Sequence, residues 1–216
     1  MSKRVAILIS GRGSNMQSIV AASKERELGG SIDLVISNRP GAKGLQIAEA
    51  ANIKSIVIDH QRYASREDFD SDLADALVGI EPDLVVLAGF MRILTPKFVK
   101  TFEGRLINIH PSLLPDYPGL DTHQRALKNG DSYAGATVHY VTDSLDGGPA
   151  ILQGKVPIDT DDDVESLANK VLKIEHQIYP IAIAWHLSER ITILNNRVRL
   201  NGTPLPRTGY KWEDLT

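Results

Sequence analysis

An amide and an imidazole stand two residues apart in Asn108-Ile-His110-Pro111. They end a short apolar run, residues 105–110, that is typical of a β-strand. Because side chains alternate along a strand, Asn108 and His110 are expected to share one face, and Pro111 favours extended backbone at His110. Such a pair can donate hydrogen bonds to an oxygen that becomes negative during acyl transfer. A hydrogen-bonded structural asparagine beside a partly buried histidine explains the two residues about equally well.

A carboxylate that could complete this pair lies further along the chain, in Leu145-Asp-Gly-Gly-Pro149. An aspartate followed by two glycines and a proline is most often a turn, in which the aspartate bonds its own backbone. The functional alternative makes Asp146 the partner of His110. A carboxylate beside an imidazole holds the ring in one orientation and increases its affinity for a proton.

The segment Ser10-Gly-Arg-Gly-Ser-Asn15 follows the first predicted strand and opens the first predicted helix. In an open α/β sheet, ligands bind at such a turn, outside the carboxyl ends of the strands. Its two glycines allow the backbone to curl, and the N–H groups of a helix N-terminus attract anions. Met16 occupies the place of the third glycine of a dinucleotide fingerprint, so the segment predicts a site for a single phosphate. The alternative is a turn in which Ser14 or Asn15 only caps the helix.

Two further charged residues are notable for their positions. Glu175 falls in the apolar stripe of the longest predicted helix, in phase with Val171 and Ile178. A carboxylate there needs a protein cation or the polar groups of a ligand as its partner. Arg92 belongs to Phe90-Met-Arg-Ile-Leu94, which follows the fourth predicted strand, and could pair with an anionic ligand. Methionine and phenylalanine in such a segment are more often core than pocket residues.

Missing residue types and motifs exclude several kinds of chemistry. The chain has no cysteine, which excludes disulfides, thiolate catalysis and sulfur-ligated zinc. The histidines form no His-x-x-x-His pair and no Glu-flanked signature, so we expect no metal site. A Gly-x-Ser-x-Gly elbow is absent as well, which disfavours a serine hydrolase.

The composition of the 216 residues is that of an ordinary globular protein. The 24 Lys and Arg against 27 Asp and Glu give a formal charge of −3, which argues against non-specific binding of nucleic acid. No apolar run approaches the roughly 20 residues of a membrane-spanning helix, and the first apolar run is too short for a signal peptide. We therefore expect a cytoplasmic protein, a monomer or homodimer, that binds only small molecules and no membrane.

In the first half of the chain, short apolar runs alternate with amphipathic stretches. The runs predict strands over residues 4–10, 32–38, 55–59, 83–89 and 105–110, and the stretches predict helices over 15–26, 43–51, 66–80 and 96–102. Phe69, Leu73, Ala76, Leu77 and Ile80 fall on one face of the third of these helices. A βαβ order of this kind implies a parallel sheet with right-handed crossovers.

The second half is expected to be built differently. Prolines and a glycine make residues 110–123 a long irregular loop, and a short helix over 122–128 follows. Antiparallel strands are predicted over 133–141 and 150–156, a long helix over 162–186 that Pro180 should kink or cut short, and a hairpin over 191–194 and 197–200 before a polar tail. The fold class is α/β, with an open, mostly parallel twisted sheet of Rossmann-like type, antiparallel C-terminal strands and flanking helices. We expect one domain over residues 1–216, in two halves, 1–110 and 111–216.

Six segments, taken together and in this order, resemble the folate-dependent phosphoribosylglycinamide formyltransferase family. They are Ser10-Gly-Arg-Gly-Ser-Asn15, Phe90-Met-Arg-Ile-Leu94, Asn108-Ile-His-Pro-Ser-Leu-Leu-Pro115, Tyr117-Pro-Gly-Leu-Asp-Thr-His123, Gly135-Ala-Thr-Val-His139 and Leu145-Asp-Gly-Gly-Pro149. The resemblance covers essentially the whole chain. It implies a formyltransferase fold in which the first half binds phosphate and the second half binds folate.

The resemblance also implies roles for the matching positions. Asn108, His110 and Asp146 match the catalytic residues of the family. The ribonucleotide is expected on Gly11, Arg12, Gly13, Ser14, Asn15, Pro111, Lys170 and Glu175. The folate is expected on Arg66, Phe90, Met91, Arg92, Ile93, Leu94, Asn108, Val141, Thr142, Asp143 and Asp146. The cosubstrate is 10-formyltetrahydrofolate, and no metal is implied.

The reaction that the resemblance implies belongs to de novo purine biosynthesis. The amine of 5-phosphoribosylglycinamide attacks the formyl carbon of 10-formyltetrahydrofolate, which gives the N-formyl product and tetrahydrofolate. Asn108 and protonated His110 would stabilise the tetrahedral intermediate, and Asp146 would tune His110. Two other functions stay open, a non-catalytic sensor of nucleotide phosphates on the same scaffold and a hydrolase in which water replaces the amine.

Overall fold

The computed structural model describes residues 2–25 and 27–215. The chain divides into two compact units, one ending at Asn108 and the other beginning at Ile109. The boundary falls within strand β5 (Leu106–His110), two residues before the expected division after residue 110.

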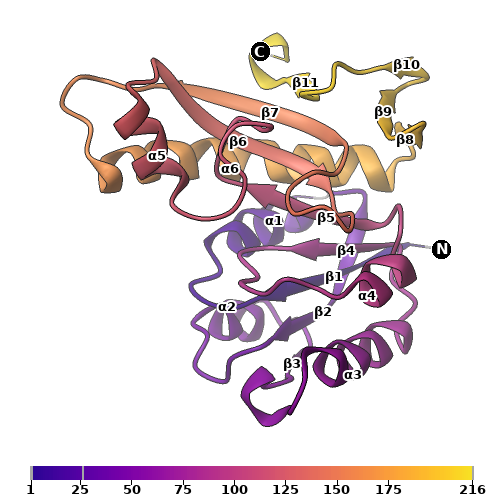
Figure 1. Cartoon of the computed structure of the whole chain (residues 1–216). Helices are drawn as coiled ribbons and strands as arrows, with labels where there is room; N and C mark the ends of the chain where they lie inside the picture. Colours follow the sequence, from indigo (N-terminus) through magenta and orange to yellow (C-terminus); the bar gives the residue numbers. More distant parts are fainter. Residues whose placement is uncertain (1, 26, 216) are drawn as a thin grey trace. The chain divides into compact units, whose positions relative to one another are not determined.

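In the first unit, parallel strands form one sheet with the order β5-β4-β1-β2-β3 (Figure 1). The strands that precede β5 in the chain are β1 (Lys3–Ile9), β2 (Gly30–Ser37), β3 (Ser55–Val57) and β4 (Leu84–Leu87). Every side chain from Val5 to Ile9 and throughout β4 is buried. Central strands that are covered on both faces have this property, which explains their continuous runs of Val, Ile and Leu.

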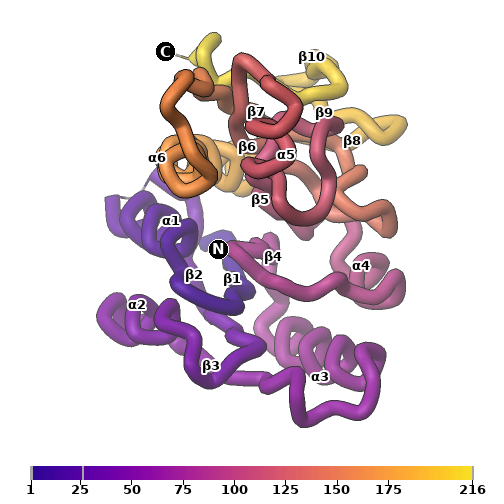
Figure 2. Tube along the Cα trace, turned by 60° about the vertical axis from the view of Figure 1, so that its left-hand side comes forward, coloured from indigo at the N-terminus to yellow at the C-terminus, as the bar shows by residue number. Residues whose placement is uncertain are grey.

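Helices cover both faces of this sheet. The helices α1 (Ser14–Lys24) and α2 (Gly44–Ala50) lie on one face, and α3 (Arg66–Val78) and α4 (Pro96–Thr101) lie on the other (Figure 2). Phe69, Leu73 and Leu77 of the predicted stripe are fully buried, because residues four apart fall on the same side of a helix. A 3₁₀ turn, η1 (His60–Arg62), joins β3 to α3.

The second unit is built around two long antiparallel strands. These are β6 (Tyr133–Tyr140) and β7 (Ala150–Pro157), preceded by α5 (Thr122–Asn129) and followed by α6 (Val164–Leu187) (Figure 1). The long helix α6 packs against both strands. A small antiparallel sheet of β8 (Ile191–Leu194), β9 (Arg197–Leu200) and β10 (Thr203–Pro204) comes next. The expected α/β class, with parallel strands first and antiparallel strands after them, is confirmed.

Some details of the second unit differ from expectation. Pro180 does not cut α6 short, since the helix continues to Leu187. The polar tail, for which the sequence predicts no strand or helix, contains β11 (Tyr210–Lys211), which pairs in parallel with β7 and leads into η2 (Trp212–Asp214). Tyr210 is fixed there by edge-to-face packing on Trp185, with ring centroids 5.7 Å apart.

The predicted end of the first helix, Arg26, lies outside the described residues. Among the residues that the structure describes, no helix combines the length and the apolar character needed to cross a membrane.

Candidate active site

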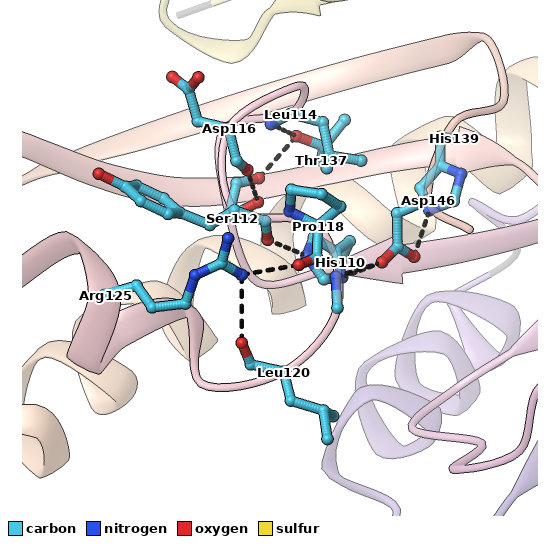
Figure 3. Close-up of polar contacts among 12 residues, drawn as sticks. His110, Ser112, Leu114, Asp116, Pro118, Leu120, Arg125, Thr137, His139 and Asp146 are labelled. Carbon is cyan, nitrogen blue, oxygen red and sulfur yellow. Dashed lines mark hydrogen bonds and ion pairs between the residues drawn. The ribbon is translucent and has the colours of Figure 1, made fainter. Parts of the chain in front are cut away.

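His110 is the last residue of β5, and its side chain is buried, with 5% of the residue exposed. Its Nδ1 lies 3.4 Å from Oδ2 of Asp146 (Figure 3). Its Nε2 lies 2.9 Å from the backbone carbonyl oxygen of Tyr117. A carboxylate and a carbonyl only accept hydrogen bonds, so each ring nitrogen faces an acceptor. Both ring nitrogens of His110 are therefore placed to donate a hydrogen bond.

Asp146 is held in place by the backbone around it. Its φ is 50°, a left-handed conformation that aspartate tolerates better than most residues. A Cβ on Gly148 would lie 1.8 Å from the carbonyl oxygen of Tyr140, so only glycine fits at this position. The N–H of Gly119 donates to Asp146 Oδ2 at 2.8 Å. The segment does form a turn, since the N–H of Gly147 donates to the carbonyl of Ser144 at 3.1 Å, but the Asp146 carboxylate bonds Gly119 and faces His110 instead of bonding its own backbone.

A second histidine, which sequence reasoning did not place in the site, lies on the other side of this carboxylate. His139 is 2% exposed, and its Nε2 is 3.8 Å from Asp146 Oδ1 (Figure 3). Its Nδ1–H donates to the carbonyl of Tyr140 at 2.9 Å. Burial lowers the pKa of the His139 imidazole from its ordinary value, against smaller opposing effects of the hydrogen bond to Tyr140 and of the Asp146 carboxylate. The available signal was alternation in β6, because Thr137 and His139 are two residues apart and share a face.

The loop after His110 is tied to this cluster by several hydrogen bonds. The hydroxyl of Thr137 donates to the carbonyl of Ser112 at 2.7 Å and accepts from the N–H of Leu114 at 3.0 Å (Figure 3). Gln153 Nε2 also donates to Thr137 Oγ1, at 2.9 Å. Further along, Tyr117 has a φ of 54°, which directs its carbonyl to His110. Thr137 thus holds the start of the loop, at Ser112 and Leu114, and the hydrogen bond to His110 holds a later part, at Tyr117.

In the first unit, the glycine-rich loop leads into α1 without a side-chain cap. Gly13 is the N-cap residue, with a φ of 77°, and no side-chain capping hydrogen bond is formed at this helix start. The interpretation of Ser14 or Asn15 as the cap is therefore wrong. A Cβ on Gly13 would lie 2.7 Å from the Cα of Gly44, so this position also requires glycine for space. The first N–H groups of α1 have no partner within the helix, which makes them suitable donors to an anion.

The segment Phe90–Leu94 is fixed at both ends by buried polar side chains of the same unit. Ser10 Oγ accepts from the N–H of Met91 at 2.8 Å, and Oδ2 of Asp70 accepts from the N–H of Thr95 at 2.6 Å. Sequence reasoning missed both anchors, since a serine and a helical aspartate have no distinctive pattern. Met91 and Ile93 are exposed by 67% and 62%.

Phe90 and Leu94, by contrast, are buried. The guanidinium carbon of Arg92 lies 5.2 Å from the ring centroid of Phe69, so Arg92 is engaged in a cation–π contact. The segment therefore presents two apolar side chains on an anchored backbone.

The other predicted site residues lie in several places. Glu175 is buried on α6 at 7% exposure, and Asn108 lies in β5 two residues before His110. Lys170 forms ion pairs with Asp159 at 2.6 Å and Asp162 at 2.5 Å, which raise the pKa of its ammonium. Arg12, Arg66 and Asp143 are exposed, and Pro111, Val141 and Thr142 are half-buried. Within the described parts of the chain, no three His, Asp or Glu side chains are grouped so as to hold a metal ion.

Comparisons with known proteins agree on one family. The model of the formyl transferase family matches residues 3–183. Over 206 residues, the chain is 47% identical to phosphoribosylglycinamide formyltransferase of Escherichia coli (strain K12), covering 95% of this chain and 97% of that protein. It is 44% identical to the human trifunctional purine biosynthetic protein adenosine-3, over 83% of this chain and 18% of that protein.

Solved structures give the same result. The phosphoribosylglycinamide formyltransferase of Coxiella burnetii, in complex with CHES, is similar with a TM-score of 0.93 and 44% identity, covering 98% of this chain and 99% of that one. A formyltetrahydrofolate deformylase from Pseudomonas syringae pv. tomato is similar with a TM-score of 0.87 and 27% identity, covering 93% of this chain and 66% of that one. The chain belongs to the formyl transferase family.

Proposed function

We propose that this protein transfers the formyl group of 10-formyltetrahydrofolate to the amine of 5-phosphoribosylglycinamide, a step of purine biosynthesis. The observation that carries the proposal is the placement of His110, a buried imidazole with the Asp146 carboxylate 3.4 Å from one ring nitrogen. The glycine-rich loop at residues 10–15, which leads into α1, favours an acceptor that carries a phosphate.

His110 and Asn108 supply the hydrogen-bond donors for the reaction. Asp146 orients the imidazole of His110 and stabilises positive charge on it. The Nε2–H of His110 donates to the carbonyl of Tyr117 in this structure, so it must exchange that acceptor for the formyl oxygen of the substrate. A donor of this kind is worth about 10²–10³ in rate when the oxygen becomes negative. The exchange keeps the N–H hydrogen-bonded before and during the reaction.

The acceptor is assigned to the loop at residues 11–15 together with Pro111 and Glu175. The uncapped first turn of α1 offers backbone N–H groups to the phosphate. The buried carboxylate of Glu175 suits the hydroxyls of a ribose, because each hydroxyl can donate to it. Lys170 is the assignment with least support, since its ammonium already lies on two carboxylates.

The folate is assigned to residues 90–94 and 141–143 with Arg66. The side chains of the first segment support its assignment to folate. Met91 and Ile93 are exposed, and Ser10 and Asp70 anchor the backbone that carries them. Exposed apolar side chains grouped on a fixed loop can form part of a ligand-binding surface. When bound, the cosubstrate supplies the activated formyl group, and residues of this chain orient it.

The experiment is turnover of 10-formyltetrahydrofolate followed by absorbance, with and without 5-phosphoribosylglycinamide. We expect turnover only with the amine present, and His110→Ala should abolish it while the surface variant Lys97→Gln retains it. Formate release at the same rate without the amine would instead identify a hydrolase, the activity named for the deformylase relative. Binding of both compounds without any turnover would identify a sensor.

A further inference from the structure

The first unit contains a pocket that the proposed reaction does not use in full. Its volume is about 510 Å³, and it is lined by residues 10–12, 39–43 and 59–61. These segments directly follow β1, β2 and β3, whose carboxyl ends lie at one edge because the strands are parallel. Ligands of open α/β sheets bind at this edge. The volume falls within the roughly 300–1,000 Å³ that is usual for small-molecule sites.

Three cationic side chains surround this pocket, those of Arg12, Arg39 and Lys43. All three are exposed, and within the described residues none has a carboxylate at ion-pair distance. The lining contains one acidic residue, Asp59, whose Oδ2 lies 3.7 Å from Nε of Arg62 and whose Oδ1 accepts from the backbone of η1. The pocket therefore has an excess of positive charge, which attracts anions.

His60 adds an oriented imidazole to the same lining. Its Nδ1 lies 2.7 Å from the carbonyl oxygen of Asn38, so this nitrogen carries the hydrogen and donates it. The ring also packs edge-to-face on Phe69, with centroids 6.3 Å apart. With Nδ1 engaged, Nε2 is the nitrogen left for a ligand, and within the described residues both hydrogen bonds of the ring are made by Nδ1. Nε2 is thus the ring atom of His60 that can form a hydrogen bond with a ligand.

The walls of the pocket are connected by backbone hydrogen bonds. The N–H of Gly44 donates to the carbonyl of Gly11 at 3.0 Å, the N–H of Asn38 to that of Ile9 at 3.3 Å, and the N–H of Ile58 to that of Ser37 at 3.0 Å. The three segments are thus held in register before any ligand binds. A site that is formed in advance loses less free energy to ordering when its ligand arrives.

We infer that this pocket binds an organic phosphate other than the formyl acceptor. The three cations and the imidazole supply donors for a phosphate with two negative charges, and the volume leaves room for an organic group attached to it. The lining shares Gly11 and Arg12 with the loop assigned to the acceptor, but it does not include Gly13, Ser14 or Asn15, the positions at the start of α1 whose N–H groups are offered to the acceptor phosphate. The distinction between the two phosphates rests on the proposed function.

The test is calorimetric titration of the full chain with ribose 5-phosphate, pyrophosphate and inorganic phosphate as probes. In the double variant Arg39→Gln/Lys43→Gln, we expect the affinity for ribose 5-phosphate to fall by at least about tenfold, since two charge-assisted contacts are lost. Lys24→Gln, which removes a charge from α1 elsewhere in the same unit, should leave this affinity unchanged. The acceptor KM of the double variant should equal that of the wild type.

A gain of affinity provides the complementary measurement. Asp59→Asn removes the single carboxylate of the lining but keeps an oxygen that can accept from η1, so we expect ribose 5-phosphate to bind about threefold more tightly. A matching chemical-shift change of the His60 ring signals on titration would support direct contact.

Three results would overturn the inference. The first is the absence of binding of every probe to the wild type. The second is a double variant whose acceptor KM rises by the same factor as its probe Kd, which would make the pocket the acceptor's own phosphate site. The third is inorganic phosphate that binds as tightly as ribose 5-phosphate. Turnover by the wild type tests the proposed function separately, so failure of one is distinguishable from failure of the other.

Discussion

In the first unit, the loop at residues 10–15 offers a ligand mainly backbone N–H groups, whereas in the second unit His110 and Asp146 offer side-chain groups that are almost fully buried. The first arrangement depends on the shape of the main chain, including a left-handed Gly13 that touches Gly44. The second depends on charge and on functional groups, because His110, Asp146 and His139 form one chain of contacts. The two regions should therefore respond to different kinds of substitution.

The largest effect is expected where a donor is deleted from the buried side-chain region. His110→Ala and Asn108→Ala should each lower kcat by about 10²–10³-fold or more, because each removes a donor to the developing negative oxygen. The Kd of the ribonucleotide, measured by calorimetry, should stay within a few-fold of the wild type. Loss of ribonucleotide binding in either variant would show that the pair is a binding element and would remove the distinction between the two regions.

A change of shape should dominate in the backbone region. Gly13→Val places a branched side chain at a φ of 77° and within 2.7 Å of the Cα of Gly44, so the loop must shift. We expect the KM of the ribonucleotide to rise by at least about tenfold and that of the folate much less. Gly11→Ala is the matched control, because a Cβ there would meet no atom within 4 Å. Equal effects of Gly13→Val on both KM values would contradict the assignment of this loop to phosphate.

Acidification tests the charge dependence of the side-chain region. Burial lowers the pKa of His139, so the unfolded chain binds a proton more readily, and stability present above pH 6.5 is lost as the pH falls below it. One such group contributes up to about 1.4 kcal/mol per pH unit. His139→Gln should reduce the slope of the free energy of unfolding between pH 6.5 and 5, measured with urea. His123 and His176, whose pKa values burial also lowers, should sustain the remaining slope, and an unreduced slope would contradict the prediction.

A smaller effect is expected from the anchor that connects two loops of the first unit. Ser10→Ala removes the acceptor of the Met91 N–H, which should raise the KM of the folate by about fivefold, the value of one hydrogen bond of ordinary strength. Ser31→Ala, whose hydroxyl bonds Asp33 instead, is the control in the same unit. If Ser10→Ala leaves the folate KM at the wild-type value, the anchored segment is not part of the folate site.

The smallest effect is expected at Lys170. Lys170→Met should leave the KM of the ribonucleotide unchanged in steady-state assays, because the ammonium is already committed to Asp159 and Asp162. A rise in that KM would restore the role in substrate binding that the family resemblance suggested.

Much of the fold could be predicted because its signals are local. The runs at β1 and β4 and the spacing of Phe69, Leu73 and Leu77 report burial directly, since a strand or helix shows its covered face in its own sequence. The pairing of β11 with β7 has no such signal, because two residues near the chain end form it with a strand far away in sequence.

The site shows the same division. The chain alone indicated that Asn108, His110, Asp146 and the loop at residues 10–15 could do chemistry, because residue type and position at a strand end or turn limit what a group can do. Only the tertiary structure decided which groups meet: His139 on the far side of Asp146, the Tyr117 carbonyl on His110, and Lys170 on two aspartates. The reason is physical, since propensity and periodicity act over a few residues, whereas hydrogen bonds and ion pairs between distant segments form only when the whole chain is packed.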